Sequence, residues 1–245
     1  MYNTGMATTI IGRQEATYLQ RVYAWLTFGI LCCSASATAT IMWGAPISAT
    51  YKDRIVEMPP AVALVAAHPI IFSLTFIFFA VMASLFRKSG SASLPIFIGF
   101  TSFSGLFIGP ALFTAQVAAA AGGTLSGSPV RDAGALTLVS FVGLTCYAAW
   151  SKRDFSVWGA ALSTGLWVLI GAMFLNVFMG STAMGLAISS VAVFVFAGYI
   201  IYDTHNVLKM SHGDDALGDA LNLFLDILNL FLHLLRILSS GYKKD

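Results

Sequence analysis

Five polar side chains interrupt an otherwise apolar stretch near the end of the chain, LNLFLDILNLFLHLLRILSS at residues 221–240. They are Asn222, Asp226, Asn229, His233 and Arg236. On an ideal α-helix they share an arc of roughly 80°, and the remaining surface of the helix is apolar. A charged side chain facing lipid at the bilayer centre is costly. We therefore predict that Asp226 belongs to an interior site and that Asn222, Asn229, His233 and Arg236 form a pore-lining polar stripe.

Two other interpretations of this stripe stay open. The segment resembles an amphipathic helix that lies flat on the membrane, although such helices usually carry a strongly cationic face and this one has a single arginine and a single aspartate. The stripe also fits a purely structural role, in which polar side chains hydrogen-bond neighbouring helices together.

A second carboxylate, Asp203, lies in GYIIYDTHNV at residues 198–207, at the predicted end of the preceding apolar span. The connection that follows is long enough for the last two helices to pack antiparallel. Asp226 then lies about 8 Å along the last helix from Leu221. We expect Asp203 and Asp226 to meet at the same depth.

Two neighbouring carboxylates in a low dielectric cannot both ionise cheaply, so the pair is expected to share a proton and to titrate as one coupled unit. Such a pair senses pH and gates: protonated, it joins two helices, and deprotonated, it attracts a cation. Arg87, at the end of the second span, is the predicted gate partner. Calcium is the other candidate, held only weakly and transiently by Asp203 and Asp226, because a tight site takes six to eight oxygen ligands.

The elements that position these residues follow from composition. Of the 245 residues, 58% are hydrophobic and 10% are charged, against about 25% charged in a typical soluble domain. A spanning helix needs about 20 mostly apolar residues. We predict an all-α polytopic membrane protein, a single transmembrane domain over 1–245, with a cytoplasmic N-terminal segment at 1–21 and spans at approximately 22–43, 69–86, 94–114, 134–150, 157–178, 184–202 and 221–238.

Close helix packing is indicated by GLFIG at residues 105–109, a GxxxG pattern that lets helices approach in lipid. We favour packing inside one bundle over a dimerisation face, and we expect Gly109-Pro110 to kink the third span.

Several classes of function are disfavoured. The net charge of +2 and the lack of a basic stretch interleaved with aromatic residues argue against nucleic-acid binding. The histidines and the three cysteines show no metal-ligand spacing. Intramembrane aspartyl proteases also pair two aspartates, but their glycine-containing catalytic motifs are missing here. We expect no enzyme activity and no cofactor.

The chain resembles the Bax inhibitor-1 family, also called the transmembrane Bax-inhibitor-motif or YccA/YetJ-like family. The resemblance rests on YLQRVYAWLTFGI from Tyr18, SKRDFSVWG from Ser151, IIYDTHNV from Ile200 and LFLDILNLFLHLLRIL from Leu223. It implies a seven-helix bundle with the last helix central and a pH-dependent calcium leak. Asp203 and Asp226 match the family's acidic pair, and Arg87 matches a basic residue that pairs with them. A glutamate found in the second helix of some relatives has no counterpart in residues 69–86.

Two functions follow from this resemblance. The first is a pH-sensitive calcium leak, with calcium as the permeant ion. The second is a modulator in stress or cell-death regulation that binds a membrane-anchored AAA protease or another membrane partner and conducts nothing. The oligomeric state is left open.

Orientation follows from the basic residues, which favour the cytoplasmic side. With the N-terminus inside, the cytoplasmic loops and N-terminal segment hold Arg13, Arg21, Arg87, Lys88, Lys152, Arg153 and Lys209, and the outer loops hold Lys52, Arg54 and Arg131. The short termini suggest a bacterial inner membrane. The basic residues near the C-terminus lie outside if the last segment spans fully, and inside if it is re-entrant.

The loop that contains Lys152 and Arg153 should therefore be cytoplasmic. We expect a Lys152→Cys variant, in a background with the native cysteines replaced by serine, to resist a membrane-impermeant maleimide in sealed cells and to react after permeabilisation. Labelling of intact cells would reverse the assigned orientation. A cysteine at Arg131 is the matched control, with the opposite expected result.

Overall fold

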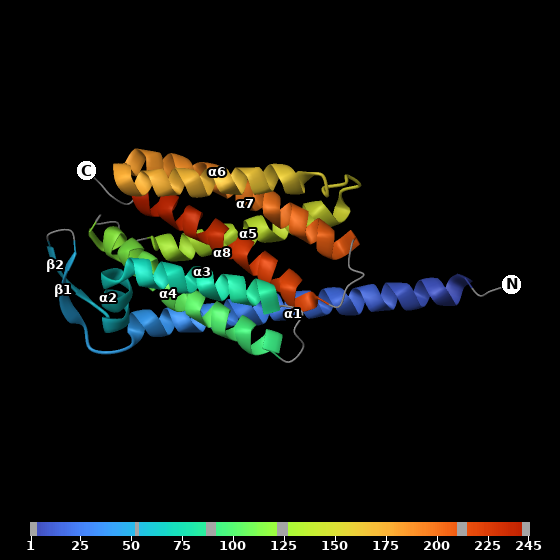
Figure 1. The fold of residues 1–245 in the computed structure, drawn as a ribbon, viewed down its shortest axis with the longest axis horizontal. Coiled ribbons are helices and arrows are strands. Elements are labelled where there is room, and N and C mark those ends of the chain that lie inside the picture. The colour runs from blue at the N-terminus through green and yellow to red at the C-terminus, as the bar shows by residue number, and fades with distance from the viewer. Residues whose placement is uncertain (1–3, 52–53, 87–91, 122–126, 210–214, 242–245) are drawn as a thin grey trace. The chain divides into compact units, whose positions relative to one another are not determined.

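The computed structural model describes residues 4–51, 54–86, 92–121, 127–209 and 215–241 (Figure 1). Within these ranges seven helices are long and apolar enough to cross a membrane. They are α1 (Thr4–Met42, apolar over Ala16–Met42), α3 (Pro69–Phe86), α4 (Ser93–Ala121), α5 (Pro129–Trp150), α6 (Trp158–Met179), α7 (Thr182–Lys209) and α8 (Ala216–Gly241). The predicted all-α, seven-span membrane fold is confirmed.

The connection at residues 44–68 contains structure that the sequence analysis did not anticipate. Strands β1 (Ile47–Tyr51) and β2 (Arg54–Met58) pair antiparallel, with Ile47 opposite Met58 and Tyr51 opposite Arg54. Helix α2 (Pro60–Ala67) follows, with proline at its first position, where the missing N–H has no helical partner to lose.

Several helices continue beyond the apolar segments that predicted them. Helix α5 begins at Pro129 because the Ser128 side chain accepts a hydrogen bond from the Arg131 backbone N–H. Helix α4 continues through Pro110 to Ala121. Helix α7 continues to Lys209. Asp203 therefore lies inside the helix, whereas the sequence analysis had placed it at the helix end.

The chain forms two compact units. One comprises residues 1–114 and 213–221, and the other comprises residues 115–212 and 222–245. The prediction of a single transmembrane domain over 1–245 stays a prediction.

In the first unit, α1 and α4 approach closely at the glycines of GLFIG. A Cβ atom on Gly105 would overlap the Cys33 carbonyl oxygen and lie 2.8 Å from the Ala37 backbone nitrogen. A Cβ on Gly109 would lie 2.5 Å from Thr40 Cγ2. The GxxxG pattern therefore serves packing between two helices of the same unit. Stacked phenylalanines join α3 to α4, with the ring centroids of Phe76 and Phe107 4.8 Å apart.

In the second unit, α7 packs against α6 and α8. Its buried core consists of Leu169, Ile188, Ala192, Phe196, Ile200 and Leu230. Small residues again allow close approach, since a Cβ on Gly159 would lie 2.8 Å from the Tyr202 hydroxyl. In α7 and α8, 44% of the most apolar window is buried, against 6% in α6. Helices α7 and α8, like α4 in the first unit, are thus buried enough for polar side chains to avoid lipid.

Gly105→Ala should destabilise the protein by about 1–3 kcal/mol, because the added methyl group forces α1 and α4 apart. Gly143→Ala is the matched control, since a Cβ there meets nothing within 4 Å and alanine favours a helix. Thermal unfolding in detergent measures both. Equal unfolding temperatures for Gly105→Ala and the wild type would contradict the packing role.

Candidate functional site

The two acidic residues singled out in the sequence lie together between α7 and α8. A side-chain hydrogen bond joins Asp203 to Asp226. Farther along the same two helices, His233 Nδ1 lies 3.2 Å from Ser189 Oγ. From Asp226 to His233 the residue numbers rise along α8, whereas their partners on α7 fall from Asp203 to Ser189. The two helices therefore run antiparallel, as predicted. The expected meeting of the two carboxyl groups is present in the structure.

Burial makes this acid pair electrostatically unusual. Asp226 is 6% exposed, whereas Asp203 is half-buried. Asp226 Oδ2 has no hydrogen-bond partner among the described residues. Two carboxyl groups can form a hydrogen bond with each other only if at least one of them carries a proton. The contact between the two carboxyl groups thus requires a shared proton, and the coupled titration of the pair stays a prediction.

Tyr199 lies one turn before Asp203 on α7. Its side chain is hydrogen-bonded to Ser163 of α6, and its ring is within electrostatic reach of both aspartates. Tyr199 therefore lies near the acid pair, and its phenol adds no charge there at neutral pH.

The middle of the polar stripe of α8 makes contacts both within α8 and with α7. Asn229 donates from Nδ2 to the Leu225 carbonyl of its own helix at 2.8 Å. The His233 ring stacks on Phe196, with centroids 5.9 Å apart and an interplanar angle of 18°.

The two ends of the stripe differ in exposure. Arg236 is exposed, and its guanidinium group lies directly against Gly185, near the Asn176 side chain. Asn222 is half-buried. His233 and Arg236 thus contact neighbouring helices, as a structural role of the stripe requires. The pore-lining role of the stripe stays a prediction.

A metal would find few ligands at the acid pair. No group of three or more His, Cys, Asp or Glu side chains suited to a metal ion occurs in the described part of the chain. Asp203 and Asp226 supply the carboxylates of the predicted weak calcium contact. The predicted gate partner, Arg87, lies outside the described residues.

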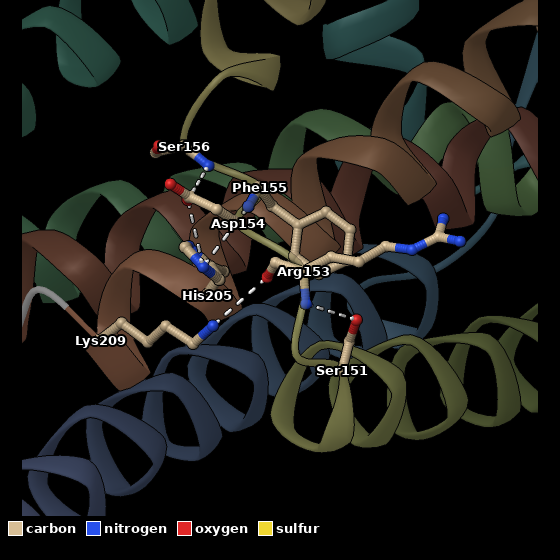
Figure 2. A network of polar contacts seen from close by, with 7 residues as sticks. All are labelled: Ser151, Arg153, Asp154, Phe155, Ser156, His205 and Lys209. Carbon is tan, nitrogen blue, oxygen red and sulfur yellow. Dashed lines mark hydrogen bonds and ion pairs between the residues drawn. The ribbon is translucent and has the colours of Figure 1, made fainter.

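The sequence analysis missed a second polar network, at the turn between α5 and α6 (Figure 2). His205 Nε2 accepts a hydrogen bond from the Phe155 backbone N–H at 3.4 Å and lies 3.5 Å from Asp154 Oδ1. Lys209 Nζ donates to the Arg153 carbonyl oxygen at 3.3 Å. The signal was a phenylalanine placed directly after the charged run SKRD, and a histidine two residues after Asp203.

Asp154 is the exposed member of this network. The Ser156 backbone N–H donates to Asp154 Oδ1 at 2.9 Å. This bond, the Ser156 hydroxyl, His205 and Lys209 together lower the pKa of the Asp154 carboxyl. Asp154 is therefore ionised at neutral pH.

The fold and this site define a polytopic α-helical membrane protein with a buried ionisable pair between two of its spans. A family model described as Inhibitor of apoptosis-promoting Bax1 matches residues 15–243. The chain belongs to the Bax inhibitor-1 family.

Curated relatives support the same assignment. The chain is 38% identical over 154 residues to an uncharacterized protein of Campylobacter jejuni, Cj0236c, covering 63% of this chain and 64% of that protein. It is 40% identical over 115 residues to protein lifeguard 4 of Mus musculus, covering 47% and 48%. It is 32% identical over 149 residues to Bax inhibitor 1 of Schizosaccharomyces pombe, covering 60% and 52%. The matches thus span about half to two thirds of these relatives.

The acid pair should make stability depend on pH. As pH rises and the shared proton is lost, two buried anions repel each other, so the wild-type unfolding temperature should fall by several degrees. Asp226→Asn keeps a hydrogen-bonding side chain and removes one charge, so its unfolding temperature should change less over the same range. Thermal unfolding in detergent from about pH 5 to 9 tests this. Parallel curves for the two proteins would show that the pair does not titrate as proposed.

Proposed function

We propose that this protein is a pH-sensitive calcium leak channel gated by Asp203 and Asp226. The observation that carries the proposal is the buried contact between these two carboxyl groups, placed between spans α7 and α8. A purely structural role does not require two carboxyl groups to meet between spans, because a charge inside a span is costly and apolar side chains pack there without that cost.

The gate works through the proton. While the pair holds a proton, the hydrogen bond ties α7 to α8 at this depth. When the proton leaves, the two carboxylates repel each other, and the charge favours entry of a cation. Arg87 competes with the cation for this charge, as the family resemblance implies.

Calcium suits a site of this composition only as a passing ion. A tight calcium site takes six to eight oxygen atoms, and two carboxylates provide four. The contact is therefore weak enough for release, which conduction requires. In this proposal calcium is the permeant ion, no cofactor takes part, and the protein catalyses no reaction.

The polar stripe of α8 would continue the path of the ion beyond the acid pair. Asn222, Asn229, His233 and Arg236 follow Asp226 along one face of α8, and His233 already faces the Ser189 hydroxyl of α7. Separation of α7 and α8 at the acid pair would expose these polar groups to the same water-filled path.

A second function is favoured by the names of the relatives. Besides protein lifeguard 4, a Golgi anti-apoptotic protein of vaccinia virus is 39% identical over 115 residues. By this alternative the protein modulates a membrane partner in stress or cell-death regulation, such as a membrane-anchored AAA protease, and conducts no ions. The structural role of the stripe fits this alternative equally well.

The proposed location is a bacterial inner membrane with the N-terminus in the cytoplasm. The support for it is the excess of basic residues in the loops assigned to that side. The acid pair then lies toward the cytoplasmic end of α7.

Calcium flux into proteoliposomes that contain only this protein tests the channel. We expect flux from the wild type to change severalfold between about pH 6 and 8. Asp203→Asn and Asp226→Asn should each flatten this response to a similar extent, because either substitution leaves a single titrating group. The double variant should add little, because the two residues act as one unit.

Ser190→Ala, a change on α7 at an exposed hydroxyl that donates to the Leu186 carbonyl of its own helix, is the control and should keep the wild-type pH profile. A wild-type profile in all three aspartate variants would remove the acid pair from the gate. No flux from any variant, including the wild type, would favour the modulator that binds a membrane partner.

A further inference from the structure

The turn between α5 and α6, residues 151–157, is anchored by one buried side chain. Phe155 is 1% exposed, although residues on both sides of it are exposed. Its ring meets His205 of α7 edge-on, with centroids 5.5 Å apart and planes at 90°. Tyr147 of α5 and Trp158 of α6 complete its surroundings. The buried Phe155 side chain therefore anchors the turn to helices α5, α6 and α7.

Two hydrogen bonds hold the same turn to α7 (Figure 2). The Phe155 backbone N–H donates to His205 Nε2, and Lys209 Nζ donates to the carbonyl oxygen of the neighbouring Arg153. His205 and Lys209 are four residues apart and so lie on the same face of α7, one turn from each other. The α5–α6 turn is thus hydrogen-bonded to one face of α7 at two positions, one helical turn apart.

Asp203 and His205 lie on opposite faces of α7. Two residues along an α-helix correspond to a rotation of roughly 200°. Asp203 contacts Asp226 of α8, and His205 contacts the α5–α6 turn. The same helical turn of α7 is therefore held from both sides.

We propose that His205 is a positioning residue for Asp203. By accepting the Phe155 N–H, it fixes the end of α7 on the α5–α6 turn and so sets the distance and orientation at which Asp203 meets Asp226. This proposal rests on the proposed function, because it makes the turn a determinant of the gate.

The proposal depends on hydrogen-bond acceptance and not on charge. The groups that face His205 are the Asp154 carboxylate, whose Oδ1 lies 3.5 Å from Nε2, and Lys209, one turn farther along α7. Asp154 has a side-chain exposure of 70% and is held by the Ser156 backbone N–H. An exposed contact of this kind contributes little to stability, whereas a buried N–H that loses its acceptor is costly.

Three substitutions separate these roles. His205→Gln places a neutral acceptor near the position of Nε2 and cannot take up a proton at these pH values. His205→Ala removes the acceptor. Asp154→Asn removes the charge next to His205 and keeps Oδ1 for the Ser156 N–H. If acceptance is what matters, His205→Gln and Asp154→Asn should resemble the wild type, and only His205→Ala should differ.

Hydrogen exchange in detergent, followed by mass spectrometry, measures the anchoring directly. His205→Ala should speed exchange in residues 151–158 and in the last two turns of α7 by about tenfold, the scale of one lost buried hydrogen bond. His205→Gln should restore most of the protection. Wild-type protection in His205→Ala, or equal loss in His205→Gln, would overturn the proposed hydrogen-bond role.

The pH profile of calcium flux then tests the link to the gate. His205→Ala should shift or flatten the profile, and His205→Gln should restore it, which a general loss of stability would not reproduce. If exchange changes and the profile does not, the turn is anchored as proposed but does not position Asp203.

A wild-type protein without any flux would refute the proposed channel and leave the exchange result intact. In that case, altered exchange around Asp226 in His205→Ala decides whether the turn acts on the acid pair. If His205→Ala fails to fold, Lys209→Met removes the bond to the Arg153 carbonyl, together with the lysine charge near Asp154 and His205, and keeps the bond from the Phe155 N–H to His205. It should loosen the same segments to a smaller degree, and unchanged exchange there would overturn the two-point anchor.

Discussion

The contact between Asp203 and Asp226 is the constraint on which the rest of the second unit depends. A carboxyl group inside a membrane span must find a partner, and Asp226 finds another acid. That pairing sets the antiparallel register of α7 and α8. In this register His233 lies within hydrogen-bond distance of Ser189, and the guanidinium group of Arg236 lies against Gly185, which has no side chain. The polar face of α8 is thus matched to α7 over much of its length.

Several other polar side chains in the described spans hydrogen-bond within their own helix. The hydroxyl groups of Thr40, Thr101, Ser104 and Thr137 each donate to the backbone carbonyl four residues earlier. Such bonds leave no polar group facing a neighbouring helix. Against this background, the polar contacts that α7 makes through Asp203, Ser189 and His205 add specificity to its packing in the second unit.

The seven spans and the acid pair were predictable from the sequence, because both follow from strong local signals. Long apolar runs mark the helices, and an aspartate inside such a run has few alternatives to a buried partner. The continuation of α7 to Lys209 was not predictable from hydropathy, since YDTHNVLK is mixed in polarity and its helix is supported by tertiary contacts. The roles of Phe155 and His205 were missed because these two partners lie 50 residues apart in sequence. Strands β1 and β2 were not predicted, because residues 44–68 were interpreted only as a connection between two spans.

The close fit of Arg236 on Gly185 has an evolutionary consequence. A side chain at position 185 would enter the space of the guanidinium group, so an alanine there requires the end of the long, exposed Arg236 side chain to move. A substitution at position 185 therefore changes where the charge of residue 236 lies, so we expect the two positions to vary together among related chains.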